Sequence, residues 1–141
     1  MFAASNSPSQ AYANVGVETG VMAANPHKLI LMLFEGAIKS VAMAKEAMQK
    51  RRIAEKGEAI SKAIDIIVNG LRLSLDLDRG NDIAQRLASL YDYMSERLLH
   101  ANLRNDEAAL EEVRTLLMEL KSAWEEIAKD TSAVSDSRTA A

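Results

Sequence analysis

The chain has no proline after Pro26 and no glycine after Gly80. A fold built from β-strands needs frequent turns, and glycine and proline are the residues that most often supply them. Two prolines and six glycines among 141 residues are too few for such a fold. Because this length is that of one domain, the sequence predicts a single all-α domain.

The first helix is predicted to begin at Asn25-Pro26. Asparagine is a favoured N-cap, and proline is favoured at the first helical position, where its missing N–H costs no hydrogen bond. The preceding residues, 1–24, are mostly small or polar, carry Glu18 as their only charge and show no helical period. We therefore expect residues 1–24 to form a flexible N-terminal arm and residues 25–130 to form a helical domain.

Apolar residues recur with a helical period in four segments. These segments span about 26–50, 54–77, 82–104 and 107–129. Asn81 or Asp82 is expected to cap the third helix, and Asn105-Asp106 the fourth. Residues 131–141 are mostly Ser, Thr and Ala and are expected to form a disordered C-terminal tail. Four helices of this length with short connections pack most simply as an antiparallel up-down four-helix bundle.

On each predicted helix the apolar face is wider than a single core stripe. A helix in a bundle contacts two neighbours, so a wide stripe can be core. A contiguous apolar surface on a soluble protein can also mark a partner site that accepts an amphipathic helix. Leu99 and Leu103 project among Asp92 and Glu96, away from the predicted core. Periodicity leaves both interpretations open for the flanking residues, and the candidate partner-binding residues in the helices are Ile66, Leu73, Leu77, Leu99, Leu103, Leu116 and Ala123.

Two other features belong to this prediction. Ala59, Ala63 and Gly70 would let a partner helix approach closely along the seam of the second helix. Trp124 falls in phase with the main stripe of the fourth helix, so we expect it to be a buried plug of the bundle end.

No catalytic, cofactor-binding or metal-binding pattern occurs in the sequence. There is no cysteine, and neither His27 nor His100 has a metal-binding spacing. The di-iron bundle signature needs Glu-x-x-His, whereas Glu96 and His100 are four residues apart. The segment 76–87 resembles an EF-hand loop only faintly, because its twelfth residue is leucine. We therefore predict a protein that is not an enzyme and that has no cofactor.

Charge and hydropathy exclude two further classes of partner. The net charge is −3, and the only basic cluster, Lys50-Arg51-Arg52, is interpreted as a solvated helix end. Because phosphate neutralisation dominates nucleic-acid affinity, we expect no nucleic-acid partner. No segment approaches the ~20 apolar residues of a membrane span. The first basic residue is Lys28, so a signal peptide is not indicated. We expect a cytoplasmic protein that does not insert into membranes.

Several short motifs stand in a distinctive order along the chain. They are Tyr12 in the arm, the run 23–37 (Ala-Ala-Asn-Pro-His-Lys-Leu-Ile-Leu-Met-Leu-Phe-Glu-Gly-Ala), Leu90-Tyr91-Asp92-Tyr93-Met94 with Leu98 and Ala101-Asn102, and Leu120-x-x-Ala123-Trp124. Over nearly the whole chain these motifs resemble the flagellar secretion chaperones for flagellin, the FliS family, whose first helix opens with Thr-Ala-Ser-Pro-x-x-Leu-Ile-x-Met-Leu-Tyr-Asp-Gly-Ala. This sequence departs from that pattern at four positions, Ala23, Asn25, Phe34 and Glu35.

The resemblance implies a cytosolic helical bundle that binds the C-terminal segment of flagellin. It implies that the protein keeps flagellin from polymerising early and passes it to a component of the flagellar type III export gate. Tyr12 stands where the family has its arm tyrosine, and we expect it to fold back onto an apolar groove as a temporary plug. The alternative is a homo-oligomerising helical adaptor whose seam on the second helix binds a second copy, giving a weak homodimer.

Overall fold

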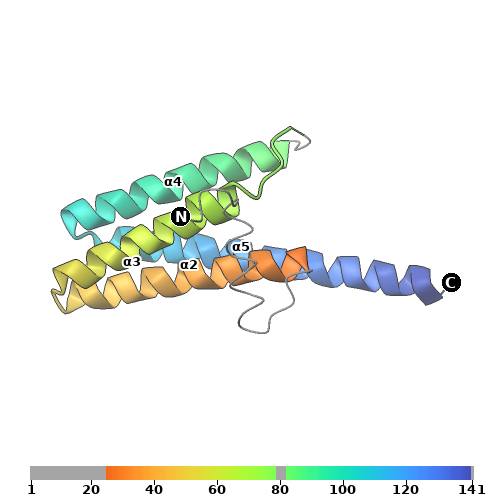
Figure 1. Cartoon of the computed structure of the whole chain (residues 1–141), viewed down its shortest axis with the longest axis horizontal. Helices are drawn as coiled ribbons and strands as arrows, with labels where there is room; N and C mark the ends of the chain where they lie inside the picture. The colour runs from red at the N-terminus through yellow and green to blue at the C-terminus, as the bar shows by residue number, and fades with distance from the viewer. Residues whose placement is uncertain (1–24, 79–81, 141) are drawn as a thin grey trace, which may run out of the picture.

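The computed structural model describes residues 25–78 and 82–140, with side chains up to residue 127. The residues predicted to form the arm, 1–24, lie outside this described part. In the described part the elements are helices and no strand is present (Figure 1). The all-α prediction is therefore confirmed. In chain order the helices are α2 (Pro26–Gln49), α3 (Ile53–Asp65), the π-helix η2 (Ile66–Arg72), α4 (Asp82–Arg104) and α5 (Glu107–Ala140).

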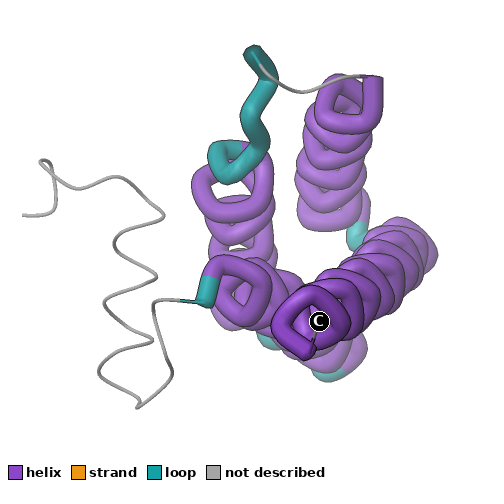
Figure 2. Tube along the Cα trace, turned by 90° about the vertical axis from the view of Figure 1, so that its right-hand side faces the viewer, coloured by secondary structure: helices purple, strands orange, loops and turns teal. Residues whose placement is uncertain are grey.

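The helices form a four-helix bundle in which α3 and η2 together make the second helix. Figure 2 looks along the bundle and shows the four helical columns end-on. Helix α2 packs against α3 and α5, while α4 packs against α5, α3 and η2, so the contacts close into a ring. The core is made almost entirely of aliphatic side chains. Its largest fully buried residues are Val41, Ile60, Ile67, Leu71, Met94, Leu98, Leu110, Val113 and Leu117.

Two predicted helix starts are confirmed by their capping hydrogen bonds. The Asn25 side chain accepts a hydrogen bond from the backbone N–H of Lys28 at 3.1 Å. The Asp106 carboxylate accepts one from the backbone N–H of Ala109 at 3.2 Å. Each bond satisfies one of the amides that an α-helix leaves free in its first turn.

The second predicted helix, 54–77, differs from the structure at both ends and in the middle. Helix α3 starts at Ile53, its α-helical part ends at Asp65, and the π-helix η2 follows and ends at Arg72. The Ser74 hydroxyl then donates to the Gly70 carbonyl oxygen at 2.6 Å, and such side-chain bonds to the backbone compete with a continuing helix. The prediction of helix through Leu77 was therefore wrong, and the residues after η2 form a turn.

Helix α5 is longer than the fourth predicted helix. Its backbone is helical to Ala140, past the end expected near residue 129 and through most of the segment 131–141 for which a disordered tail was predicted. In Figure 1 this part of α5 projects beyond the other helices, at the end of the bundle where α2 begins.

The two ends of the bundle are built differently. One end holds the α2–α3 turn at residues 50–52 and the α4–α5 turn at residues 105–106, and we call it the closed end. There the buried Lys56 ammonium, 6% exposed, donates to the Asn102 carbonyl oxygen at 3.0 Å and to Asn105 Oδ1 at 2.5 Å. These bonds connect α3 to the α4–α5 turn. The other end, where α2 begins and η2 ends, is the open end.

Candidate partner-binding groove

An apolar cavity of about 330 Å³ lies at the open end of the bundle, and we call it the end groove. All four columns of the bundle contribute to its walls, and nearly every lining side chain is aliphatic or aromatic. The lining residues are Ile30, Phe34, Leu71, Ser74, Leu75, Ile83, Leu87, Tyr91, Leu120, Ala123, Trp124 and Ile127.

The early end of η2 leaves this cavity open. After Arg72 the chain turns away instead of continuing along the bundle, and α4 begins at Asp82. Large side chains around the groove are consequently left in contact with water, with Ile83 63% and Ile127 50% exposed. Burying such surface in a complex releases roughly 25 cal/mol for each Å² of apolar area removed from water. The open end therefore offers a surface that gains free energy when an apolar segment covers it.

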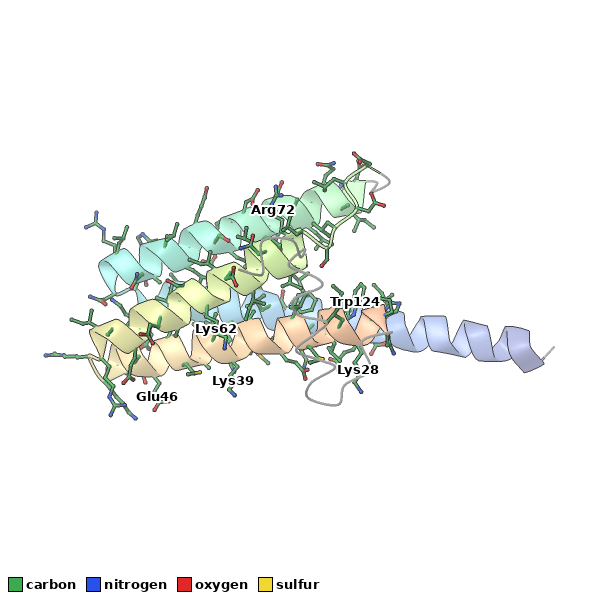
Figure 3. The ribbon with its side chains drawn as sticks, viewed as in Figure 1. Lys28, Lys39, Glu46, Lys62, Arg72 and Trp124 are labelled. Atoms are coloured by element: carbon green, nitrogen blue, oxygen red, sulfur yellow. The ribbon has the colours of Figure 1, made fainter. Side chains whose placement is uncertain are left out.

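Trp124 forms the wall between the end groove and a neighbouring cavity. Its indole Nε1 donates to the His27 carbonyl oxygen at 2.8 Å, and the two rings lie 4.8 Å apart at an interplanar angle of 31°. The second cavity, of about 470 Å³, is bounded by the first turn of α2, the turn after η2 and the same indole. Figure 3 places Trp124 beside the start of α2. The indole is half-buried, so Trp124 contributes to the core and to the groove at once.

Two polar side-chain groups near the groove are held in place or kept neutral. Arg72 Nε donates to Asp92 Oδ1 at 2.8 Å and Arg72 Nη2 to Asp92 Oδ2 at 3.2 Å, so a two-point ion pair connects η2 to α4. Tyr91 is 3% exposed, and burial raises the pKa of its phenol to about 12. The phenol therefore stays uncharged into the alkaline pH range, and the groove keeps its apolar character there.

Leu73 and Ala123 lie together at the open end, in agreement with their prediction as surface residues. Leu73 is 54% exposed and lines the second cavity, and the exposed Ala123 lines the end groove. Leu77, also predicted, is 36% exposed in the turn after η2. Whether any of them binds a partner stays a prediction.

Two predicted residues belong to the interior. Ile66 is 4% exposed and lies opposite Gly36 of α2, where a Cβ atom on the glycine would be 3.4 Å from Ile66 Cδ1. Ala59 and Ala63 of the same seam are also buried, so their small size serves packing within the bundle. Leu116 is half-buried against the core. Placing Ile66 on an accessible groove was therefore wrong, because this part of the wide stripe faces a neighbouring helix.

The remaining predicted residues are separate from the end groove. Leu99 and Leu103 on α4 are 53% and 80% exposed, as their position among acidic side chains indicated, and neither lines the end groove. Tyr12 lies outside the described residues.

Sequence reasoning missed part of the open end. Ile83 is in phase with Leu87 along the sequence, which is the spacing of a core residue, yet it stands at the rim of the groove and is 63% exposed. Ile127 lines the same groove and is 50% exposed. For Ile83 the available signal is its position in the first turn of α4, whereas α5 continues past Ile127 to Ala140.

The described residues contain no group of three or more His, Cys, Asp or Glu side chains arranged to hold a metal ion. Within the same ranges, no helix combines the length and apolar character required to cross a bilayer. The arrangement at the open end is suited to recognition, in which an apolar helix or extended segment replaces water in a preformed groove.

Comparison with known proteins places the chain among flagellar proteins. Residues 8–131 match the model of the family described as flagellar protein FliS. The flagellar secretion chaperone FliS of Salmonella typhimurium is 50% identical over 123 residues, which cover 87% of this chain and 91% of that protein. The Escherichia coli chaperone of the same name is 45% identical, with 91% and 94% covered. The Bacillus subtilis one is 33% identical, with 84% of each chain covered.

Proposed function

We propose, from the premise that this chain belongs to the FliS family of flagellar proteins, that it binds the C-terminal segment of flagellin in the cytoplasm. Its relatives are flagellar secretion chaperones, and it is a flagellar export chaperone with a non-enzymatic role. In this proposal the bound chaperone prevents premature polymerisation of flagellin. It then assists delivery to the flagellar type III export apparatus, through contact with a component of the export gate.

The end groove is the observation that supports flagellin binding most directly. It is apolar, it is open to solvent, and exposed side chains from the turn after η2, from α4 and from α5 surround it. A segment that is disordered when free can fold as an amphipathic helix on such a surface. The ordering cost, on the order of 2–5 kcal/mol, limits the affinity and so favours release at the export gate.

A charge placed beside the groove tests this proposal. Leu73→Glu puts a carboxylate at a position that is 54% exposed, where no core contact is lost. We expect the affinity for a peptide from the flagellin C-terminus to fall at least tenfold, about 1.4 kcal/mol, while the helix content stays unchanged. The matched control is Met43→Glu on α2, because Met43 is 55% exposed and lies away from the groove. Isothermal titration calorimetry measures the affinities, and circular dichroism checks the fold.

Leu103→Glu examines the second exposed patch, on α4, in the same assay. A wrapped segment that contacts both α4 and the open end would lose affinity in this variant as well. Equal affinities for Leu73→Glu, Met43→Glu and the unchanged protein would contradict flagellin binding beside the second cavity at the open end.

The alternative function is a homo-oligomerising adaptor. The size of the protein in solution distinguishes this alternative from the flagellin chaperone. Sedimentation velocity over a range of concentrations measures whether the free protein associates. A concentration-dependent dimer that Leu73→Glu abolishes, together with no flagellin binding, would favour the adaptor.

A further inference from the structure

A third cavity, of about 370 Å³, lies at the closed end of the bundle, between the α2–α3 turn and the α4–α5 turn. It is separated from the end groove by most of the length of α2, about 30 Å for a helix of this size. Figure 3 shows this separation, with Glu46 near the closed end and Trp124 at the open end. The lining residues are Ala47, Met48, Arg51, Arg52, Ile53, Lys56, Asn105 and Glu107.

The cavity lining is positively charged on a chain whose net charge is −3. It contains three cationic side chains, Arg51, Arg52 and Lys56, and one carboxylate, Glu107. Arg51 and Arg52 of the basic run thus share one concave surface with Lys56, whereas Lys50 is outside the lining and pairs with Glu46. An arrangement of this kind attracts anions from solution.

Two of the three cations have no carboxylate partner within the described residues. Lys56, a residue that is 6% exposed, donates from its ammonium to two neutral oxygens, the Asn102 carbonyl and Asn105 Oδ1. Arg51 makes no side-chain hydrogen bond or ion pair in the same part of the chain, and its backbone φ is 57°. Arg52 has one partner, Glu55, at 3.6 Å.

An apolar side chain stands beside these charges. Ile53, the first residue of α3, lines the cavity and is 77% exposed. A ligand that satisfied only the cations would leave this side chain in water. The lining therefore matches a ligand in which an apolar group lies next to a negative charge.

We infer that the cavity at the closed end is a second binding site, which accepts an acidic peptide segment of a partner protein through Arg51 and Lys56, with an apolar side chain of the segment against Ile53. Charge complementarity identifies the occupant, because the cations lie in one cavity with an apolar wall. A nucleic acid would require a longer track of cations along the surface. The inference does not depend on flagellin binding, since the two sites share no lining residue.

The probe for this site is a blocked synthetic peptide, acetyl-Glu-Leu-Glu-Glu-Leu-Glu-amide, titrated into the uniformly ¹⁵N-labelled full chain. The largest amide shift changes are expected at Arg51, Ile53 and Lys56, and the same peptide with Gln in place of Glu should produce none. Arg51→Gln should weaken binding by about fivefold, because a charge-assisted hydrogen bond is lost. Glu107→Gln should strengthen binding, because it removes the one carboxylate from the lining.

Two variants separate binding from folding. Arg51→Gly removes the guanidinium and puts glycine at a left-handed position that costs glycine nothing, so this variant should be at least as stable while binding the peptide less well. Arg86→Gln, an exposed arginine near the start of α4, controls for the loss of one positive charge anywhere on the surface.

Three outcomes overturn the inference. The first is the absence of localised shift changes at millimolar peptide. The second is equal weakening by Arg51→Gln and Arg86→Gln, which would indicate unspecific attraction. The third is an Arg51-dependent affinity for an RNA oligonucleotide, or for vesicles with anionic lipid, that exceeds the affinity for the peptide. Because the two cavities share no lining residue, these outcomes do not test flagellin binding at the open end, and the proposed function is tested separately.

Discussion

Replacing Trp124 by alanine should destabilise the bundle by about 3 kcal/mol. The indole joins α5 to the first turn of α2 by a 2.8 Å hydrogen bond to the His27 carbonyl oxygen and by stacking on the His27 ring. It also packs against the core as a half-buried side chain. A loss of this size is a large fraction of the 5–15 kcal/mol that is typical of a small domain.

The magnitude is the sum of three separable contributions. The hydrogen bond accounts for about 1 kcal/mol, and the ring contact with His27 for about 0.5–1 kcal/mol. The remainder is apolar contact, which is smaller than for a fully buried tryptophan because the indole also faces the groove. Trp124→Phe should therefore cost about 1–2 kcal/mol, since it loses the hydrogen bond and keeps most of the contact area. His27→Ala removes the stacked ring but keeps the carbonyl acceptor, and should cost about 0.5–1 kcal/mol.

Urea unfolding followed by far-ultraviolet circular dichroism measures all three variants, because this signal does not depend on the tryptophan that is removed. The urea concentration at the unfolding midpoint should be highest for the unchanged protein and should decrease in the order His27→Ala, Trp124→Phe and Trp124→Ala. A Trp124→Ala protein with an unaltered midpoint and a reduced affinity for the flagellin peptide would refute the reasoning. It would mean that the indole belongs to the partner site alone.

Three further changes have expected outcomes. Burial raises the pKa of Tyr91 from 10.0 to about 12. The neutral phenol therefore contributes about 2–3 kcal/mol to the free energy of unfolding below pH 10, and this contribution is lost as the pH rises to 12. In Tyr91→Phe, the urea midpoint should consequently fall less steeply between pH 10 and pH 12 than in the unchanged protein. Lys56→Met leaves the Asn102 carbonyl and the Asn105 amide oxygen without their donor and should cost about 2 kcal/mol in the same assay, whereas a stable variant would show that these bonds contribute little. If the arm plugs a groove, Tyr12→Ala should raise the affinity for the flagellin peptide, and unchanged affinity and oligomeric state would contradict the plug.

Features of the fold that depend on local chemistry could be predicted from the sequence. The Asn25 cap and the Asp106 cap each need only a side-chain oxygen three residues before a free amide, so their residues identify them. The π-helix could not be predicted in this way. A period of 100° per residue places Ile66 and Ile67 on different stripes, and both are buried because η2 packs against two neighbours, α2 and α4, so their burial gives no sign of the change in helix type.

The candidate site was predicted only in part, for a related reason. Periodicity identifies which residues share a face, but it does not say whether a neighbouring helix covers that face. Leu73 is exposed because it follows the last residue of η2. Ile66, the first residue of η2, is covered by α2. Ile83 has the phase of a core residue and is exposed for the same reason as Leu73. Where each helix stops therefore decides which apolar residues are available to a partner.

The hydrogen bonds of Lys56 at the closed end also have a mechanical consequence. The α2–α3 pair and the α4–α5 pair are each joined by a tight turn at that end, and Lys56 fastens one pair to the other beside those turns. At the open end, the Arg72–Asp92 ion pair and the indole of Trp124 hold the pairs together nearer the groove. The closed end thus combines two covalent turns with buried hydrogen bonds, whereas the contacts at the other end surround an open apolar cavity. We therefore expect amide hydrogen exchange to become faster from the closed end toward the open end.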